Sequence, residues 1–440
     1  DYEPTLTAPE IEENLATVRN VRLLDPAIMR DTFQQTQGIK SFYDFRDIDV
    51  DRYEIDGRTT QVVLAARELK QTDLPNSSWE SEHIAFTHGY GIAAAPANAI
   101  DANGRPDYAL ADIPVSAGPG AESLTVDTPG LYIGEGLRGY AIVGAARDEV
   151  DFQDNDDQTE VTRYSGADGV DINSLPRKLA FALRFAEPNL VVSGELGSDS
   201  RILYKRDVVD RAKTLAPFLK FDRDPYPAII DGKVMWILDA YTSTDMFPYA
   251  QRVNPRAVRS GDLRTQANYV RNSIKVVVDA YDGTPTFYIV DDEDPIAKSY
   301  RKQFPNLFSE EQPPAEVAEH FRYPEDLFRM QTDMWGRYRI TEASEFYDAA
   351  GAWSVAQDPG NSIGQTAVES VIDASGNIIS SAEVRIAPQY LLMRLPGDDD
   401  ESFVIFRPFV PFSDDDSRKN LEGFMVVHND PERYGEIEVY

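Results

Sequence analysis

The sequence predicts an α+β fold, mostly antiparallel β-hairpins and sheets with interspersed helices, and three observations support this prediction. Asp-Gly pairs at 56–57, 231–232 and 282–283 each separate two β-rich runs, as expected where a tight turn closes a hairpin. Segments with apolar residues at helical spacing lie between these hairpins. The last third returns to strand-like runs, notably YLLMRL (390–395) and SFVIFRPFVPF (402–412).

Two helices are expected before the first strands. Thr7 and Glu10 form a capping box, and the apolar residues Ile11 and Leu15 then fall on one helical face. A second helix is expected to begin at Asp25-Pro26, because Asp caps helix N-termini and Pro suits the first helical turn.

Three more helices are expected farther along the chain. One covers residues 178–185, and a second is capped by Asp207 and ended or kinked by Pro217. A third begins at Pro324 and runs through Trp335. We place a domain boundary near the point where strands give way to helices. Residues 1–165 then hold N-terminal helices and a β-rich lobe, and residues 166–440 form a mixed α/β lobe with acidic loops.

Composition excludes several classes of protein. The formal net charge is −32, from 75 acidic and 43 basic residues, which argues against unaided binding to nucleic acid or to anionic lipid headgroups. The absence of Cys excludes thiol catalysis, disulfides and Cys-ligated zinc. No apolar run approaches the ~20 residues of a membrane-spanning helix. The acidic start shows no signal-peptide pattern, so we expect Asp1 to be a mature start or the start of a fragment.

The segment FTHGYG (86–91) carries the first catalytic candidate, His88. His-Gly followed by a second glycine is similar to the oxyanion loop of lipase-like hydrolases, which also requires a nucleophile and a base. The chain offers few bases, because it has only four histidines. The alternative is a structural role, in which the glycines allow a bend at a strand end.

A Gly-x-Gly-x-x-Gly pattern occurs at Gly134, Gly136 and Gly139. In a dinucleotide-binding fold a helix begins inside this motif, whereas YAIVG (140–144) is typical of a strand. Glu135 would also face the pyrophosphate. We therefore interpret the segment as a glycine-rich connection between strands and assign no cofactor-binding residue.

Metal sites receive weaker support. His83 and His88 lie in a strand-like segment and are expected to point to opposite faces, while Glu316 and His320 have helical i, i+4 spacing without a second histidine pair. Calcium is a candidate cofactor, because two loops offer clustered carboxylates. These candidates are Asp154, Asp156, Asp157, Asp291, Asp292 and Asp294. Solvated acidic loops that serve solubility are the alternative.

Several long blocks match a known family in order along the chain. They are FTHGYGIAAAPAN (86–98), LYIGE (131–135), DRDPYPAIIDGKVMWILDAYTSTDMFPYAQ (222–251), NYVRNSIKVVVDAYDGT (268–284), FRYPEDLFRMQ (321–331) and YLLMRLPG (390–397). Together they resemble uncharacterised protein family 0182, whose members are large bacterial membrane proteins, common in actinobacteria. The resemblance implies several transmembrane helices, then a soluble region outside the cytoplasmic membrane that this chain represents, then an acidic tail.

The resemblance brings no established activity or catalytic residue. Our leading hypothesis is therefore an extracytoplasmic domain that binds or organises a cell-envelope component, with the missing transmembrane region as a partner and no nucleic acid. The rival hypothesis is an envelope-processing enzyme, a hydrolase or transferase acting on glycan, lipid-linked sugar or peptide. Its candidate residues are His88, Glu135, Asp239 and Asp245, which would have to converge in one cleft. A calcium-dependent structural module is the third hypothesis.

Overall fold

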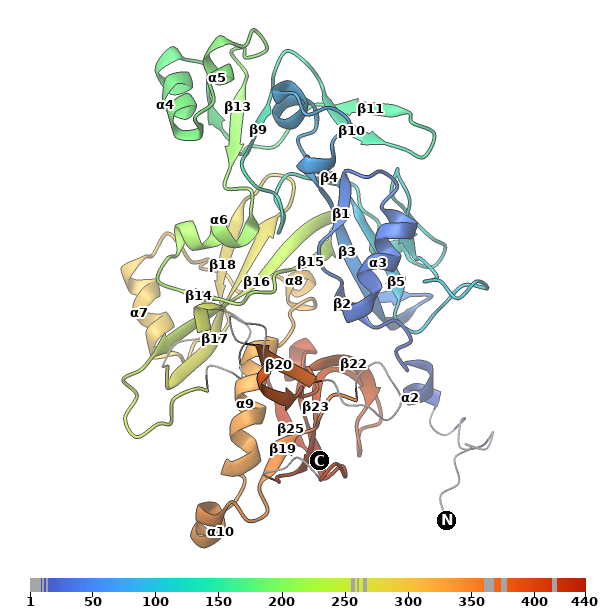
Figure 1. The fold of residues 1–440 in the computed structure, drawn as a ribbon, viewed down its shortest axis with the longest axis vertical. Helices are drawn as coiled ribbons and strands as arrows, with labels where there is room; N and C mark the ends of the chain where they lie inside the picture. Colours follow the sequence, from blue (N-terminus) through green and yellow to red (C-terminus); the bar gives the residue numbers. More distant parts are fainter. Residues whose placement is uncertain are drawn as a thin grey trace. The chain divides into compact units, whose positions relative to one another are not determined.

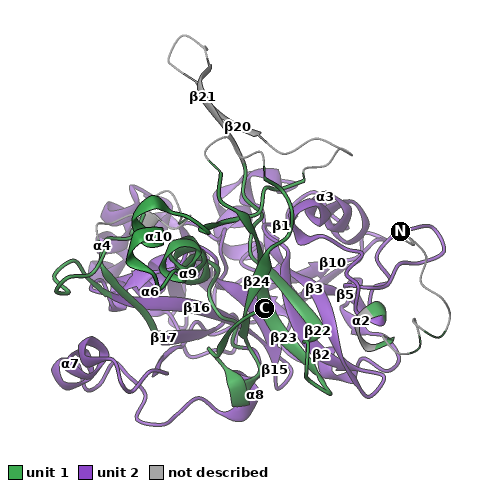
Figure 2. Ribbon diagram, turned by 90° about the horizontal axis from the view of Figure 1, so that it is seen from below, with its two compact units in different colours: residues 1–18, 243–272, 321–440 green, residues 19–242, 273–320 purple. Residues whose placement is uncertain are grey.

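The computed structural model describes residues 9, 12, 15–254, 258, 261–263, 267–359, 368–372, 378–413 and 418–440. They form two compact units, coloured in Figure 2. One unit contains residues 1–18, 243–272 and 321–440, and the other contains residues 19–242 and 273–320. The expected boundary between residues 165 and 166 falls inside the unit of residues 19–242 and 273–320. The capping box at Thr7 and Glu10 lies outside the described residues, and the described helix there, α2, covers Leu15–Arg19.

The first sheet of the larger unit, residues 19–242 and 273–320, has six strands in the order β1-β3-β5-β6-β7, with β2 also paired to β3 (Figure 1). The strands are β1 (Tyr43–Phe45), β2 (Asp49–Ile55), β3 (Arg58–Leu69), β5 (Ile92–Pro96), β6 (Leu110–Ala111) and β7 (Ser116–Ala117). Asp56 and Gly57 both have positive φ and join β2 to β3 as a two-residue turn, as expected.

A second sheet has the order β14-β16-β17-β18, with β15 paired to β16. Its strands are β14 (Lys220–Phe221), β15 (Tyr226–Ile230), β16 (Lys233–Thr244), β17 (Tyr269–Asp279) and β18 (Pro285–Ile289). Asp231-Gly232 forms the expected tight turn. The predicted two-residue turn at Asp282-Gly283 is instead part of a longer connection between β17 and β18. The side chain of Asp279 ends β17 early, because it accepts hydrogen bonds from the backbone N–H groups of Tyr281 and Asp282.

Three smaller sheets complete the strands of this unit. They pair β12 (Val170–Asp171), β13 (Arg201–Tyr204) and β9 (Tyr140–Val143); β10 (Glu149–Gln153) and β11 (Thr159–Thr162); and β4 (Gly89–Tyr90) and β8 (Gly130–Leu131). The strand predicted after the glycine motif is thus confirmed as β9. The prediction that His83 lies in a strand is wrong. Residues Ser81–Ala85 form a π-helical turn, which is closed by the backbone N–H of Phe86 donating to the carbonyl of Ser81.

Six helices with described bounds lie in this unit. They are α3 (Pro26–Gln37), α4 (Leu175–Phe185), α5 (Asn189–Val192), α6 (Val208–Leu215), α7 (Pro295–Gln303) and α8 (Ala315–Ala318). The main core joins both large sheets, since buried side chains of β3 (Val62, Leu64), β16 (Trp236, Leu238) and β17 (Ile274, Val276) belong to one apolar cluster. The helices expected at Asp25-Pro26, at 178–185 and after Asp207 are confirmed as α3, α4 and α6.

The other unit, residues 1–18, 243–272 and 321–440, contains a five-stranded sheet and two helices after residue 321. The sheet has the order β19-β23-β24-β25, with β22 paired to β23. Its strands are β19 (Trp353–Val355), β22 (Gln389–Arg394), β23 (Glu401–Pro411), β24 (Gly423–His428) and β25 (Ile437–Val439). A separate antiparallel pair is formed by β20 (Val368–Ile372) and β21 (Ile378–Glu383). The two helices are α9 (Glu325–Tyr338) and α10 (Ala343–Asp348). The helix expected from Pro324 is therefore confirmed. In the part of the chain described, no helix combines the length and apolarity needed to cross a bilayer.

Candidate functional site

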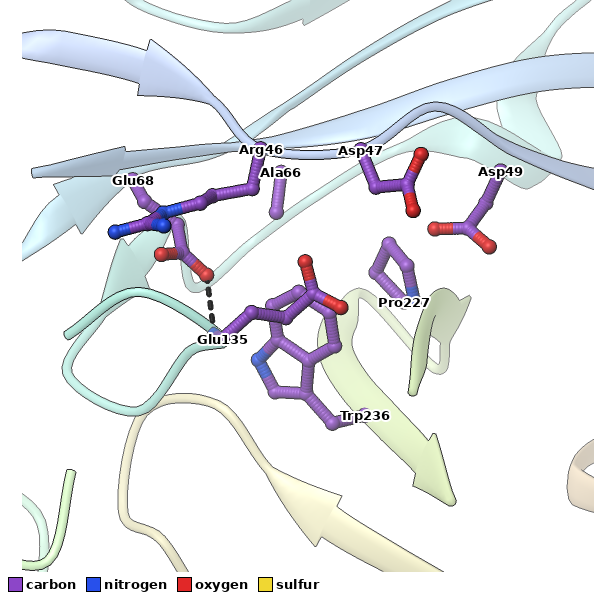
Figure 3. A pocket seen from close by; sticks show the side chains of 8 residues that line it. All are labelled: Arg46, Asp47, Asp49, Ala66, Glu68, Glu135, Pro227 and Trp236. Carbon is purple, nitrogen blue, oxygen red and sulfur yellow. Dashed lines mark hydrogen bonds between the residues drawn. The ribbon is translucent and has the colours of Figure 1, made fainter. Parts of the chain in front are cut away.

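A narrow recess in the larger unit gathers acidic side chains from segments far apart in the sequence (Figure 3). Its lining residues are Arg46, Asp47, Asp49, Ala66, Glu68, Glu135, Pro227 and Trp236. Glu68, Asp49 and Trp236 are buried, while Arg46 and Asp47 are exposed at the mouth. The recess therefore has an acidic wall, an apolar floor and one basic group at its edge.

Sheet geometry places these residues. Ala66 and Glu68 are two positions apart on β3, so both point to the same face of that strand. Pro227 of β15 and Trp236 of β16 are cross-strand partners, which sets them side by side. The indole Nε1–H of Trp236 donates to the carbonyl of Ile133 at 2.9 Å, and this bond fixes the ring beneath the loop that carries Glu135.

The glycine motif forms a cradle for the Glu68 carboxylate. Glu68 Oε1 accepts from the backbone N–H of Glu135 at 2.5 Å, and Oε2 accepts from that of Gly136 at 2.7 Å. A Cβ on Gly134 would lie 2.3 Å from Glu68 Oε1, and one on Gly136 would lie 2.1 Å from Arg46 Nε. The two glycines thus leave room for the Glu68 and Arg46 side chains, which gives the Gly-x-Gly pattern a packing role.

Both glutamates of the recess hold protons more tightly than usual. Burial raises the pKa of Glu68 from 4.5 to about 7, even though the two backbone N–H donors act to lower it. Burial also raises the pKa of Glu135 well above its ordinary value, and the nearby carboxylates of Glu68, Asp49 and Asp47 add to this effect. Figure 3 shows the Glu135 carboxylate directed into the recess, next to the Trp236 ring.

The space between these side chains is small. With the side chains in these positions it admits no sphere the size of a water molecule. A guest as large as a water molecule must therefore displace a side chain on entry, and Glu135 is the one held by a loop with glycines on both sides.

His88 lies elsewhere, in a separate buried network. Its Nδ1 is 2.8 Å from Thr87 Oγ1, its Nε2 is 3.4 Å from Asp151 Oδ1, and its ring stacks on Tyr132 at 4.4 Å between centroids. Glu149 accepts from Thr87 Oγ1 at 2.5 Å and from the Tyr132 hydroxyl at 2.9 Å. His88 and Thr87 are both buried, and these contacts stabilise the fold of the segment.

The glycines after His88 also have a packing role. A Cβ on Gly89 would lie 2.3 Å from the carbonyl oxygen of Arg67, and Gly91 has a φ of +67°. Arg206 holds the same segment, because its guanidinium donates to the carbonyl of Thr87, and to that of Tyr132 at 2.9 Å. These observations favour the structural bend over the oxyanion loop.

The remaining catalytic candidates do not join Glu135. Asp239 forms a buried ion pair with Lys275, and Asp245 is exposed just beyond β16, in the unit of residues 1–18, 243–272 and 321–440. The lining of the recess thus includes Glu135 but not His88, Asp239 or Asp245. A Gly-x-Ser-x-Gly pattern, the kind that carries a serine nucleophile in hydrolases, occurs at 360–364 and lies outside the described residues.

The calcium candidates take part in turns and caps. Asp154 accepts from the backbone N–H groups of Asp156 and Gln158, and Asp157 pairs with Lys40 at 2.5 Å. In the second loop the Asp291 side chain accepts from the backbone N–H of Glu293, and Asp292 pairs with Arg301 at 3.3 Å. Asp294 caps α7.

The histidine candidates for a metal site do not lie in a ligand cluster within the described residues. His320 Nδ1 lies 2.6 Å from Asp51 Oδ2, and its ring packs on Tyr53. Within the described ranges, no three His, Cys, Asp or Glu side chains are grouped as metal ligands. Calcium binding stays a prediction for calorimetric titration.

Sequence reasoning found Glu135 but missed Glu68, Asp49, Arg46 and Trp236. One signal was present for Glu68, since Arg67-Glu68 interrupts the apolar strand QVVLAA (61–66) with two charges. Charged residues inside a buried strand are costly unless they are hydrogen-bonded, so they point to a specific structural or functional use.

Comparison with known proteins places the chain in a family. The model of the uncharacterised protein family UPF0182 matches residues 1–440, and the chain belongs to this family. UPF0182 proteins of Methanospirillum hungatei and Moorella thermoacetica are each 38% identical to it, over 439 and 440 residues. A UPF0182 protein of Rhodococcus opacus is 37% identical over 471 residues.

These matches cover 99–100% of the chain but only 44–45% of each of these relatives. The chain therefore spans a little under half the length of the curated relatives that it matches. No solved structure matches it.

Proposed function

We propose that this chain is the extracytoplasmic part of a bacterial membrane protein and that it binds a component of the cell envelope. Support comes from the family resemblance, which implies transmembrane helices before a soluble region, and from relatives more than twice as long as the chain. Protease treatment of intact cells tests the location. Cleavage within this region of the full-length protein, without lysis, supports the proposal, and protection until lysis contradicts it.

The recess is the binding site, and its guest is a primary ammonium group. The observation that carries this assignment is the Glu135 carboxylate directed into a recess with Glu68, Asp49 and Asp47 beside the Trp236 ring. An ammonium group donates three hydrogen bonds, which carboxylates accept, and an indole face attracts a cation. The buried carboxylates therefore gain a counter-charge that replaces the protons they otherwise retain.

A titration with ethylammonium chloride tests this assignment. A ligand with three non-hydrogen atoms binds at best near 1 mM, so the expected dissociation constant is millimolar. Glu135→Gln should abolish binding, while Glu160→Gln, which neutralises an exposed carboxylate on β11, should not change it. Arg46→Gln should strengthen binding, because it removes the cation at the mouth of the recess. Equal affinities in all four proteins would exclude the recess as the site.

Acid-base catalysis on an envelope glycan or peptide is the second candidate function. The observation that favours it is the pair of glutamates in one recess, with the pKa of Glu68 raised to about 7, where a general acid works efficiently. Mass spectrometry of envelope fragments incubated with the chain would detect products. Products that form with the wild type but not with Glu68→Gln would favour catalysis over simple binding.

A further inference from the structure

Helix α4 carries a stripe of exposed apolar side chains. Leu175, Leu179 and Leu183, spaced by four residues, are 60%, 45% and 83% exposed. Because residues four apart share a helix face, the three leucines form one continuous row. Val192 of α5, which packs beside α4, is 74% exposed (Figure 1). The large exposure of three leucines on one helix is the opposite of what a core-facing helix shows.

Another side of α4, about a third of a turn away from the stripe, already supplies the packing that the fold needs. Phe181, Ala182 and Phe185 pack against a core cluster that includes Ile142 of β9 and Ile202 of β13. The helix ends at Ala186, which has the left-handed conformation common at helix C-termini. The leucine stripe is therefore not required to hold α4 on its sheet, and a different role must account for it.

The charge of α4 differs from that of the chain as a whole. Residues 174–186 contain Arg177, Lys178 and Arg184 and no acidic residue, although the chain has a net charge of −32. At about 100° per residue, Lys178 lies about 60° from Leu175 at one edge of the stripe, while Arg184 and Arg177 lie about 100° and 120° beyond Leu183 at the other edge. Arg177 also pairs with Asp171 at 3.6 Å, and Lys178 donates to the carbonyl of Leu196 at 3.0 Å.

We propose that α4 docks on the surface of a lipid bilayer that contains anionic lipids. An exposed apolar stripe on a helix whose charged side chains are all basic is the pattern of a helix that lies in the membrane interface, with the leucines at the acyl boundary and the cations within reach of the phosphates. The charge complementarity is local. Charges beyond about 8 Å are screened at physiological ionic strength, so the acidic remainder of the chain opposes this contact only weakly.

This inference does not depend on the acidic recess. The net charge of −32 predicts repulsion from anionic lipid only if the charge is spread evenly over the surface. The charged residues of 174–186 are all basic, so this helix is an exception. The absence of cysteine makes a direct test simple, because one introduced cysteine is the only thiol in the protein.

The test labels the 440-residue chain at Leu183→Cys with an environment-sensitive fluorophore and adds vesicles of phosphatidylglycerol and phosphatidylcholine in equal parts. The emission should shift to the blue and gain intensity, because the label enters an apolar layer. A label at Ile28→Cys, on α3 and 63% exposed, is the matched control and should not respond. Equal responses at both positions, or none at position 183, would overturn the proposal.

A second measurement uses variants in a vesicle sedimentation assay. Leu175→Gln/Leu179→Gln/Leu183→Gln should weaken binding at least about tenfold, because glutamine keeps helix propensity but removes the apolar stripe. Leu23→Gln/Ile28→Gln/Leu421→Gln removes three comparably exposed apolar side chains elsewhere and should bind like the wild type. Wild-type binding by the α4 variant would overturn the proposal. The exposed positions make misfolding a poor explanation for a loss, and circular dichroism checks it.

Discussion

At the scale of single residues, Glu68 and Glu135 show how burial and the backbone act on one carboxylate in opposite directions. Glu68 accepts two backbone N–H bonds that favour its charged form, yet its burial outweighs them and raises the pKa to about 7. Burial also raises the pKa of Glu135, and the neighbouring carboxylates raise it further. Near neutral pH the recess therefore holds protons, and the proposed binding of a cation predicts their release.

Glu68 predicts a pH dependence of stability. Its pKa is higher in the folded chain than the ordinary 4.5, so between these values the folded state binds more protons than the unfolded state. The free energy of unfolding should therefore fall as the pH rises from about 4.5 through 7, by up to about 3 kcal/mol from this group. Urea denaturation at pH 5 and pH 8 measures this difference.

Glu68→Gln should flatten that pH dependence, because the amide does not titrate. Glu160→Gln is the matched control, since it neutralises an exposed carboxylate and should keep the wild-type slope. A Glu68→Gln protein with the full wild-type slope would show that another group is responsible.

At the scale of elements, the pairing of β16 with β17 encloses the ion pair of Asp239 and Lys275, both nearly inaccessible to solvent. Removing one partner of a buried ion pair leaves an uncompensated charge, whereas replacing both with apolar groups is much better tolerated. Lys275→Met should therefore lower the free energy of unfolding by about 3–5 kcal/mol.

Lys275→Met/Asp239→Leu should regain most of that loss in the same urea denaturation experiment. If the double variant is as unstable as Lys275→Met, the ion pair is not the reason for the loss. A structural role for Asp239 would then lose its main support.

The close contact of β3 with the segment at β4 gives a third prediction. A Cβ on Gly89 would meet the backbone carbonyl of Arg67 at 2.3 Å, and backbone atoms cannot yield as a side chain does. Gly89→Ala should cost about 1–3 kcal/mol of stability, while Gly194→Ala, where nothing lies within 4 Å, should cost little. Equal stability of the two variants would contradict the packing role of this glycine.

Local elements were more predictable than the recess. The Asp-Gly turns at 56–57 and 231–232 and the helix caps at Asp25 and Asp207 depend on residues adjacent in sequence, so their chemistry alone locates them. The turn at Asp282-Gly283 differs because a side chain, Asp279, competes for the backbone N–H groups. The recess depends on how two sheets pack, which no local pattern encodes.

At the scale of the whole molecule, a net charge of −32 opposes folding through repulsion among the acidic groups. Salt screens this repulsion, so the Tm should rise by several degrees between low ionic strength and about 0.15 M sodium chloride. A differential scanning calorimetry series measures the change, with sucrose at equal osmolality as the control for effects other than charge. A Tm that falls with salt would show that attractive ion pairs outweigh the net repulsion.

The measurement that tests the acidic recess most directly is the number of protons released when ethylammonium binds at pH 7. Isothermal titration calorimetry in two buffers of different ionisation enthalpy gives this number. We predict net proton release for the wild type and none for Glu135→Gln, because the cation lowers the raised pKa values of Glu68 and Glu135. Binding without proton release, or the same release from Glu135→Gln, would contradict the recess as a site where a cation exchanges with protons.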